Sequence, residues 1–332
     1  MKIVADQAIP FLKGVLEPWA DLCYLPGREI TPEVVAEADA LIVRTRTRCD
    51  EALLKGSRVK MVATATIGFD HIDRAWCEAS GVEVATAAGC NARGVLQWVG
   101  GVLAHLSQRE GWRPGERTLG VVGVGHVGSL VSEYARQWGF RVLHSDPPRA
   151  EREAGFESLP IRELAARCDI LTFHTWLDEK SYHLCDRELL SLMPAHAVVL
   201  NSSRGEVVDN EALLESGHPC CLDVWEGEPQ LNGALLERAR VATPHIAGYS
   251  LQGKARATAM AVEAVARRFD LPLRGWYPEG MPRSEPRNLG WEELCSTIGA
   301  YFDVEAESRL LKGRPHDFEA LREGYLYRKE YF

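Results

Sequence analysis

The sequence lacks the features that mark several classes of protein. No run of about 18 apolar residues occurs, so no membrane-spanning helix is expected. The first ten residues, MKIVADQAIP, have the pattern of a strand and lack the apolar region of a signal peptide. The net charge of −9 argues against binding to nucleic acid or to anionic membranes, because both need a basic surface. We therefore expect a cytoplasmic protein without nucleic-acid or membrane partners.

Cysteine and histidine are present, but not in the spacings that bind metals. The nine cysteines are an odd number, and no C-x-x-C pair occurs among them. The ten histidines show no H-x-x-x-H spacing. We expect reduced thiols, as in a cytosolic protein, and no metal site.

Strand-like runs alternate with helical patterns along most of the 332 residues, a length that suits two domains and a small third part. The first part predicts strands at 2–5, 40–44, 61–66 and 82–86, with helices between them at 31–39 and 71–80. Such alternation predicts parallel strands joined by crossover helices. A long helix follows at 92–110, where apolar residues recur with a 3.6-residue period.

A second alternating series begins after the Gly/Pro-rich break at 111–118. Its strands are predicted at 119–123, 141–145, 169–175, 197–203, 220–224 and 240–246. Six strands with intervening helices are the number in a full dinucleotide-binding sheet. Another helix is expected at 253–269, and the tail from about 290 has the pattern of helices in a small appendage.

The glycines of VVGVGHVGSL, at 123, 125 and 128, have the G-x-G-x-x-G spacing. Gly123 permits a tight turn, Gly125 lets the backbone approach a pyrophosphate, and Gly128 lets helix and strand pack closely. Three glycines can also form an ordinary turn. Here, however, they follow a predicted strand and open a predicted helix, which favours a dinucleotide site.

Asp146 ends the next predicted strand, 18 residues after Gly128. An acidic residue near this spacing accepts hydrogen bonds from the adenosine ribose and disfavours a 2′-phosphate. The sequence therefore predicts NAD rather than NADP. Arg149 lies three residues further on and could bind a phosphate, but we favour its interpretation as a solvated loop charge.

Charged residues follow the last three predicted strands of this series. Arg204, in NSSRGEVVDN, can hold a substrate carboxylate with its planar guanidinium group, or can simply cap a turn. Asp223, Glu226 and Glu228 lie in CLDVWEGEP, and His245 follows Glu228 by 17 residues. A glutamate on Nδ1–H of a histidine fixes the tautomer, so that the other nitrogen can exchange a proton with an alcohol. Together with NAD, these groups predict hydride transfer from a hydroxy acid.

The stretches GVVGVGHVG, NSSRGEVVDNEAL, LDVWEGEP and TPHIAGYS together resemble the D-2-hydroxyacid dehydrogenase family. Further stretches, including TATIGFDHID, AAGCNARGV, DPPRA and LREGYLYRKEYF, resemble the members that oxidise 4-phospho-D-erythronate at C2 in the synthesis of pyridoxal 5′-phosphate. Three positions depart from the pattern: Ala88 and Trp176 stand where proline is usual, and His126 stands where an amide is usual.

The resemblance implies a role for each of several residues. Arg204, Glu228 and His245 would be catalytic. Thr45, Thr66 and Tyr249 would contact the substrate. The residues around NAD would be Gly123, Gly125, His126, Val127, Gly128, Asp146, Thr175, Ser202, Ser203, Asp223 and Gly248.

The resemblance also implies an α/β fold with two doubly wound parallel-sheet domains and a small C-terminal α+β appendage. Residues 1–92, with a return helix at 250–270, would form a flavodoxin-like substrate-binding lid. Residues 93–249 would form a Rossmann NAD domain. Residues 275–332 would form a C-terminal domain that joins two copies into a homodimer and that is shorter than usual, hence incomplete.

A substrate phosphate would need its own cationic site. Arg44, Arg46 and Arg48 alternate after a predicted strand, and an extended segment would point them to one side. Arg93 opens the long helix. Any one of these arginines could equally be solvated.

Three alternatives remain at this point. One is a related dehydrogenase acting on 3-phosphoglycerate or glyoxylate. Another is an NAD-sensing protein on the same fold that binds partner proteins without turnover. The third is a degenerate enzyme.

Overall fold

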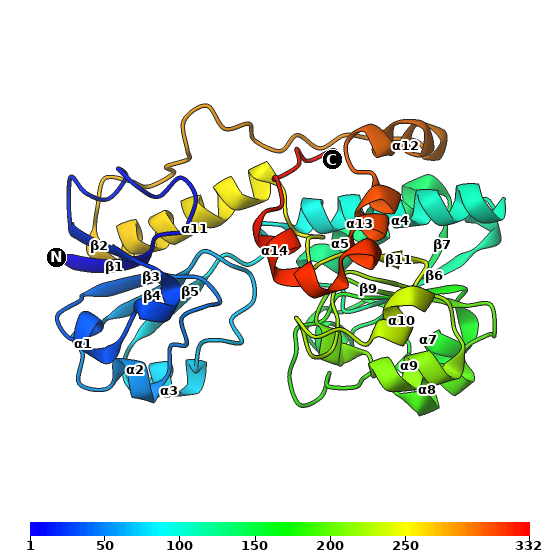
Figure 1. The fold of residues 1–332 in the computed structure, drawn as a ribbon, viewed down its shortest axis with the longest axis horizontal. Coiled ribbons are helices and arrows are strands. Elements are labelled where there is room, and N and C mark those ends of the chain that lie inside the picture. The colour runs from blue at the N-terminus through cyan, green and yellow to red at the C-terminus, as the bar shows by residue number, and fades with distance from the viewer. The chain divides into compact units, whose positions relative to one another are not determined.

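Two all-parallel sheets carry the fold, one in each of two units of the chain (Figure 1). The computed structural model describes residues 1–332. The first unit comprises residues 1–91 and 250–284, and the second comprises residues 92–249 and 285–332. The expected α/β class with two parallel-sheet domains is confirmed.

The sheet of the first unit has five strands in the order β2-β1-β3-β4-β5. This is the flavodoxin-like order, in which the chain starts near one edge and then winds to the other. All four expected strands are present. The bounds are β1 (Lys2–Asp6), β2 (Asp21–Leu25), β3 (Ala40–Val43), β4 (Met61–Thr64) and β5 (Glu83–Thr86). The short helices of this unit are η1 (Gly27–Glu29), α1 (Pro32–Val35), α2 (Glu51–Leu54) and α3 (Arg74–Ala79), and its one long helix is α11 (Leu251–Phe269).

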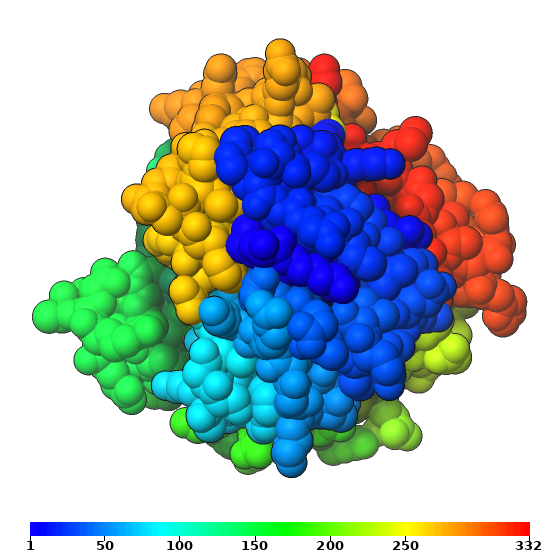
Figure 2. Space-filling model, turned by 90° about the vertical axis from the view of Figure 1, so that its left-hand side faces the viewer, coloured from blue at the N-terminus to red at the C-terminus, as the bar shows by residue number.

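Alternate residues of these strands supply two apolar cores, because successive side chains point to opposite faces of a sheet. Ile3 and Ile42 pack with α11 on one face, whereas Leu41 and Val43 pack with α1, α2 and α3 on the other. The segment between β1 and β2 also covers α11, where Oγ1 of Thr258 donates to the carbonyl of Pro10 across 2.7 Å. This segment and α11 are neighbours on the face drawn in Figure 2, in dark blue and yellow.

The sheet of the second unit has six strands in the order β11-β10-β9-β8-β6-β7, and all six were expected. The bounds are β6 (Thr118–Val122), β7 (Arg141–Ser145), β8 (Ile170–Phe173), β9 (Val198–Asn201), β10 (Cys220–Leu222) and β11 (Val241–Ala242). The helices are α4 (Ala92–Glu110), η2 (Pro114–Glu116), α5 (His126–Trp138), α6 (Pro147–Arg152), α7 (Ile161–Arg167), α8 (Arg187–Leu192), η3 (Gly205–Val207), α9 (Asn210–Ser216) and α10 (Gly233–Arg238).

The strand order of the second unit reverses between β6 and β8. The chain leaves β6 for the edge strand β7, returns to β8 on the other side, and then continues outward to β11. Ligands of open α/β sheets bind at the carboxyl ends of the strands beside such a switch point. The topology therefore predicts the site before any side chain is considered.

The C-terminal segment of the second unit is helical. It contains α12 (Trp291–Thr297), η4 (Ile298–Ala300), α13 (Val304–Gly313), η5 (Pro315–Asp317) and α14 (Phe318–Glu323). It contains no strand, so the prediction of β structure in the C-terminal appendage is wrong. The apolar residues Leu294, Ile298 and Phe302 recur at helical spacing and belong to the same core as α4. Tyr331 and Phe332 are also buried in that core.

None of the nine cysteines forms a disulfide, and seven of them are buried. Burial raises the pKa of the Cys168 thiol to about 12, so its reactive thiolate form is rare at neutral pH. None of the helices is long and apolar enough to span a membrane.

Candidate active site

The glycine-rich turn between β6 and α5 has the geometry of a pyrophosphate cradle. Gly123 has a φ of +79°, in the left-handed region that favours glycine. A Cβ on Gly128 would lie 2.0 Å from the carbonyl oxygen of Gly123, so only glycine fits there. A Cβ on Gly125 would meet nothing within 4 Å, which leaves the approach to the backbone open. His126 and Val127 form the first turn of α5, whose free N–H groups favour an anion.

Asp146 follows the edge strand β7 and lies beside this turn. One carboxylate oxygen accepts from the N–H of Val124 at 2.7 Å, and the other accepts from the N–H of Arg149 at 2.9 Å, which caps α6. The carboxylate is thereby fixed next to the glycine-rich turn, where the sequence predicts the adenosine ribose.

The Arg149 guanidinium is fully engaged. It donates to both carboxylate oxygens of Glu153, to the carbonyl of Val124 and to Oγ of Ser129, and it stacks over Phe156 at 4.4 Å. The pairing lowers the pKa of Glu153 below its ordinary value. An arginine so occupied is poorly placed to bind a 2′-phosphate. This supports NAD over NADP, although the arginine is not the free loop charge that the sequence suggested.

A cavity of about 700 Å³ lies along the edge strand β7, away from the carboxyl ends of β9 to β11. Arg136, Arg141, His144 and Phe156 contribute to its lining. Phe156 stacks on His144 with an angle of 6° between the rings. Burial and the charges of Arg136 and Arg149 lower the pKa of His144 to about 4, so this histidine is neutral.

Two predicted cofactor contacts carry buried hydroxyl groups without a hydrogen-bond partner. Thr175 follows β8 and Ser202 follows β9, and the hydroxyl oxygens of both are buried and unpaired. Buried polar atoms normally find a partner, so these two fit a bound ligand at the switch point. With the glycine-rich turn and Asp146, they make a donor set that suits NAD. Trp176 is 58% exposed beside Thr175, and its indole N–H donates to Asp178.

The three predicted catalytic residues follow β9, β10 and β11, which are neighbours in the sheet. Hydrogen bonds hold the loop after β9 at Arg204. The side-chain amide of Asn201 donates to the Arg204 carbonyl at 2.7 Å, while its oxygen accepts from both N–H and Oγ of Ser203. A Cβ on Gly205 would lie 2.1 Å from the backbone of Trp225, so the loops after β9 and β10 touch through this glycine.

Glu228 and His245 form a hydrogen-bonded pair. Nδ1 of His245 lies 2.8 Å from Oε2 of Glu228, and the N–H of Trp225 donates to Oε1 at 2.9 Å. Burial alone would raise the pKa of Glu228, but His245, Arg322 and the Trp225 N–H together hold it below its ordinary value. Glu228 is therefore a carboxylate, and Nε2 of His245 is left for other chemistry. His245 has a φ of +58°, a conformation that is costly for a non-glycine residue and that clusters at functional sites.

Asp223 holds the loop that carries His245. Its buried carboxylate accepts from Oγ1 of Thr243 and from the N–H groups of Ile246 and Ala247, at 2.6–2.9 Å. Burial raises its pKa despite these bonds. The resemblance places Asp223 beside NAD, but its carboxylate contacts within the protein indicate a structural task. Gly248 and Tyr249 complete this loop.

Thr45 and Thr66, the other predicted substrate contacts, lie in the first unit after β3 and β4. Oγ1 of Thr66 pairs with Oγ1 of Thr64 and donates to the carbonyl of Gly68, whereas Thr45 is exposed.

The expectation of an extended arginine segment at 44–48 is wrong, because β3 ends at Val43 and residues 45–47 form a turn. Arg44 pairs with Asp6, and the exposed Arg48 pairs with Asp50. Arg93, by contrast, has a buried terminal nitrogen, Nη1, without a partner.

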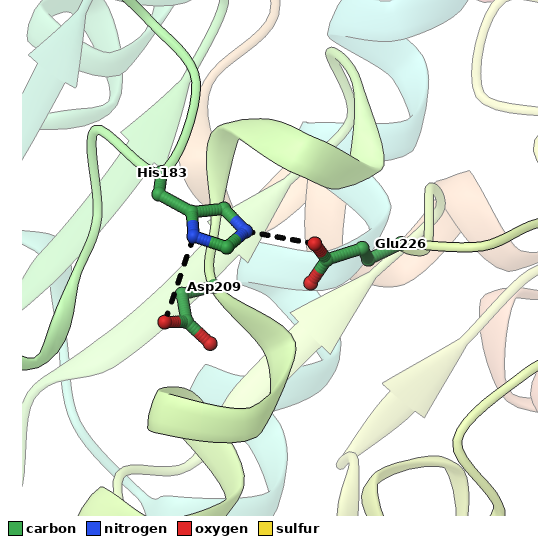
Figure 3. Close-up of side chains that lie close together, drawn as sticks. All are labelled: His183, Asp209 and Glu226. Carbon is green, nitrogen blue, oxygen red and sulfur yellow. Dashed lines mark hydrogen bonds and ion pairs between the residues drawn. The ribbon is translucent and has the colours of Figure 1, made fainter.

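A second cluster, which the sequence did not indicate, joins three loops of this unit (Figure 3). Nε2 of His183 lies 2.7 Å from Glu226, and Nδ1 lies 3.7 Å from Asp209. His, Asp and Glu can together ligate a metal, and their ligand atoms lie within 4.8 Å of one another. However, each ring nitrogen already faces a carboxylate. We interpret the cluster as a link that fixes Glu226, two residues before Glu228.

Comparisons with known proteins agree with this geometry. Residues 96–247 match the family model described as D-isomer specific 2-hydroxyacid dehydrogenase, NAD binding domain. The chain is 44% identical to the erythronate-4-phosphate dehydrogenase of Bacteroides fragilis over 342 aligned positions, covering 99% of this chain and 97% of the relative. It is 39% identical to the enzyme of that name from Serratia proteamaculans, covering 100% of this chain and 94% of the relative.

Solved structures share the fold. NAD⁺-bound 3-phosphoglycerate dehydrogenase of Entamoeba histolytica superposes with a TM-score of 0.68 at 24% identity, over 83% of this chain and 98% of that one. D-Lactate dehydrogenase of Aquifex aeolicus, complexed with NAD and lactic acid, superposes with a TM-score of 0.66 at 24% identity, over 82% of this chain and 96% of that one.

Proposed function

Since the chain belongs to the erythronate-4-phosphate dehydrogenases of the D-isomer-specific 2-hydroxyacid dehydrogenase family, we propose that it oxidises 4-phospho-D-erythronate at C2 with NAD. The product would be 2-oxo-3-hydroxy-4-phosphobutanoate, in the route to pyridoxal 5′-phosphate. The observation that carries the proposal is the 2.8 Å hydrogen bond between His245 and Glu228, formed beside Arg204 at three neighbouring strand ends.

Each catalytic residue has a defined role in the proposed mechanism. Arg204 holds the C1 carboxylate and polarises the C2 oxygen. Nε2 of His245 removes the proton of the C2 hydroxyl. Glu228, an ionised carboxylate, stabilises the imidazolium that results, and it is already in place before the reaction. Bound NAD⁺ supplies the acceptor for the hydride that leaves C2. The cofactor would be held by the glycine-rich turn together with Asp146, Thr175 and Ser202.

The substrate phosphate needs a cation that is not already paired. Arg44 and Arg48 pair with Asp6 and Asp50. Arg93 lies in the first turn of α4, where the helix dipole favours an anion, and its buried Nη1 lacks a partner. We assign the phosphate to Arg93 on this ground. Thr45, Thr66 and Tyr249 would contact the rest of the substrate.

The enzyme would act in the cytoplasm as a homodimer, as the resemblance implied. The alternatives, a dehydrogenase for 3-phosphoglycerate or glyoxylate and a partner-binding NAD sensor, have no specific observation in their favour.

The test is an absorbance assay of nicotinamide reduction by purified protein. It compares 4-phospho-D-erythronate with unphosphorylated erythronate and with 3-phosphoglycerate. The NAD content of the protein as isolated is measured first. We expect preferential reduction with 4-phospho-D-erythronate. Activity on another hydroxy acid alone would keep the mechanism and reject the substrate. Bound NAD without turnover of any of the three would reject the enzyme proposal and favour a binding protein.

A further inference from the structure

The C-terminal segment from Phe318 to Phe332 is attached to the loop that carries His245. The attachment is Arg328, whose side chain is buried. It donates to the carbonyls of Ile246, Ala247 and Tyr249, at distances of 2.5–3.1 Å, and to that of Gly94. The guanidinium also stacks over Phe302 at 4.3 Å. A loop outside the sheet thereby obtains partners for three carbonyl groups of its backbone, which would otherwise be costly to bury.

A second arginine of the same segment reaches the catalytic pair itself. Nη1 of Arg322, on α14, lies 3.7 Å from Oε2 of Glu228, the same oxygen that contacts Nδ1 of His245. The Arg322 side chain is 23% exposed and that of Glu228 is 18% exposed, so water screens this pair only partly. Guanidinium, carboxylate and imidazole therefore form one chain of polar contacts.

Arg322 also contacts Tyr249. Its Nε–H donates to the phenolic oxygen at 3.2 Å. Tyr249 is a predicted substrate contact, and this hydrogen bond fixes the orientation of its phenol.

The charge of Arg322 also acts on the ionisation of Glu228. Burial raises the pKa of this carboxyl, and Arg322 is one of the groups, after His245, that together hold that pKa below its ordinary value. Only the ionised carboxylate can stabilise the imidazolium that forms when His245 takes a proton.

We propose that Arg322 is a positioning residue of the dehydrogenase, which orients Glu228 and Tyr249 beside His245. The C-terminal segment, fastened by Arg328, is thus part of the active site of its own chain, whatever it contributes to assembly. The inference rests on the hydride-transfer reaction proposed above, but not on the identity of the hydroxy acid.

The experiment compares Arg322→Gln, Arg322→Lys and Tyr249→Phe with the full-length wild type. The control is Arg309→Gln, since Arg309 lies on α13 and pairs with Glu305 on the surface. kcat and kcat/KM are measured against pH with the hydroxy acid that the wild type oxidises best. NAD affinity is measured separately by fluorescence titration, and folding by circular dichroism.

For Arg322→Gln we expect kcat to fall by about tenfold, because misplaced catalytic groups are costly. The acid limb of kcat/KM should move up by about one pH unit, because loss of the nearby positive charge raises the pKa of Glu228, and a nearby opposite charge shifts a pKa by about 1–3 units. Arg322→Lys keeps the charge, so the acid limb of its kcat/KM profile should lie at the wild-type pH. Its kcat should not recover fully. Tyr249→Phe should lower kcat/KM without moving the limb. NAD affinity should not change.

An unchanged pH profile in folded Arg322→Gln would overturn the proposal, as would equal losses in the Arg309 control. If Arg322→Gln does not fold, a pH profile of Arg322→Lys that moves as far as expected for loss of the charge would overturn it. A wild type that oxidises a different hydroxy acid rejects the proposed substrate alone, because all these comparisons can be made with that acid.

Discussion

Nδ1 of His245 and Oε2 of Glu228 lie 2.8 Å apart, although 17 residues separate them in the chain. The contact forms because the two residues follow β10 and β11, which pair in parallel through Cys221–Val241 and Leu222–Ala242. Parallel pairing brings both carboxyl ends to the same edge of the sheet. The backbone N–H of His245 donates to the Asp223 carbonyl at 2.7 Å and fixes the approach of the two loops.

His245→Gln is expected to abolish turnover while NAD binding persists. The change removes the proton acceptor but leaves the glycine-rich turn intact. Such acid–base groups typically contribute about 10²–10⁴-fold to the rate. Steady-state kinetics and a fluorescence titration with NAD check both parts. His316→Gln, at an exposed position in the C-terminal segment, is the matched control. Near-normal turnover in the His245 variant would reject the assignment.

Gly128→Ala is expected to weaken NAD binding by about tenfold or more, because the new Cβ would lie 2.0 Å from the Gly123 carbonyl oxygen and must displace the turn. Gly233→Ala is the control, since its Cβ would meet nothing within 4 Å and alanine favours the helix it begins. NAD titration and thermal unfolding of both variants are the measurements. Equal NAD affinities in the two would contradict the cradle geometry.

Arg93→Gln is expected to raise KM for 4-phospho-D-erythronate by roughly 10- to 100-fold, the value of a hydrogen bond to a charged group. KM for unphosphorylated erythronate should hardly change. The surface variant Arg48→Gln removes an equal charge from a side chain that is 85% exposed. It should leave the KM values of both substrates unchanged. A loss that is the same for both substrates would show that Arg93 does not select the phosphate.

Acid should destabilise the protein partly through His144. Its pKa is lowered to about 4 by burial and by Arg136 and Arg149, whereas in the unfolded chain it returns to about 6.5. The unfolded state therefore binds an extra proton between these values, and stability falls as the pH drops from about 6.5 towards 4. His144→Gln should lose less free energy of unfolding between pH 7 and pH 5 than the wild type does, measured by urea denaturation. Equal losses would contradict the shifted pKa.

His183→Gln is expected to lower the free energy of unfolding by about 1–3 kcal/mol, because Asp209 and Glu226 lose a shared partner. A smaller loss of kcat should accompany it through displacement of Glu228. Urea denaturation and kinetics measure the two effects, with the exposed His196→Gln as control. Incubation with a chelator should leave the turnover of the wild type unchanged. Loss of turnover on chelation would instead indicate a bound metal.

Local patterns were sufficient for most of the sheet elements and for the cofactor turn. Apart from the edge strand β7, the strands from β6 to β11 are almost fully buried, so their residues are hydrophobic almost without interruption and easily recognised. β2 escaped notice because DLCYL lies at an edge, with one exposed and four half-buried residues. The segment at 44–48 was expected to be extended because of its alternating arginines, but β3 stops at Val43. Alternation of charge without apolar partners is weak evidence for a strand.

The contacts of the C-terminal segment with the active site could not have been predicted from spacing. Arg322 meets Tyr249 across 73 residues, and Arg328 meets Ile246 across 82. Such pairs depend on how α14 packs, which no local periodicity encodes. The same holds for His183 and Glu226, which lie 43 residues apart.

The attachment of the His245 loop by Arg328 also has a consequence for the order of synthesis. The carbonyls of Ala247 and Tyr249 are made about 80 residues before the guanidinium that binds them. At about 5–20 residues per second, a nascent chain on the ribosome would wait roughly 4–16 s with this loop unfastened. The β11 end of the sheet can pair in that interval, but the loop that carries His245 still lacks its contacts with Arg328. Completion of this loop is therefore a late event, which follows the emergence of Arg328 from the exit tunnel.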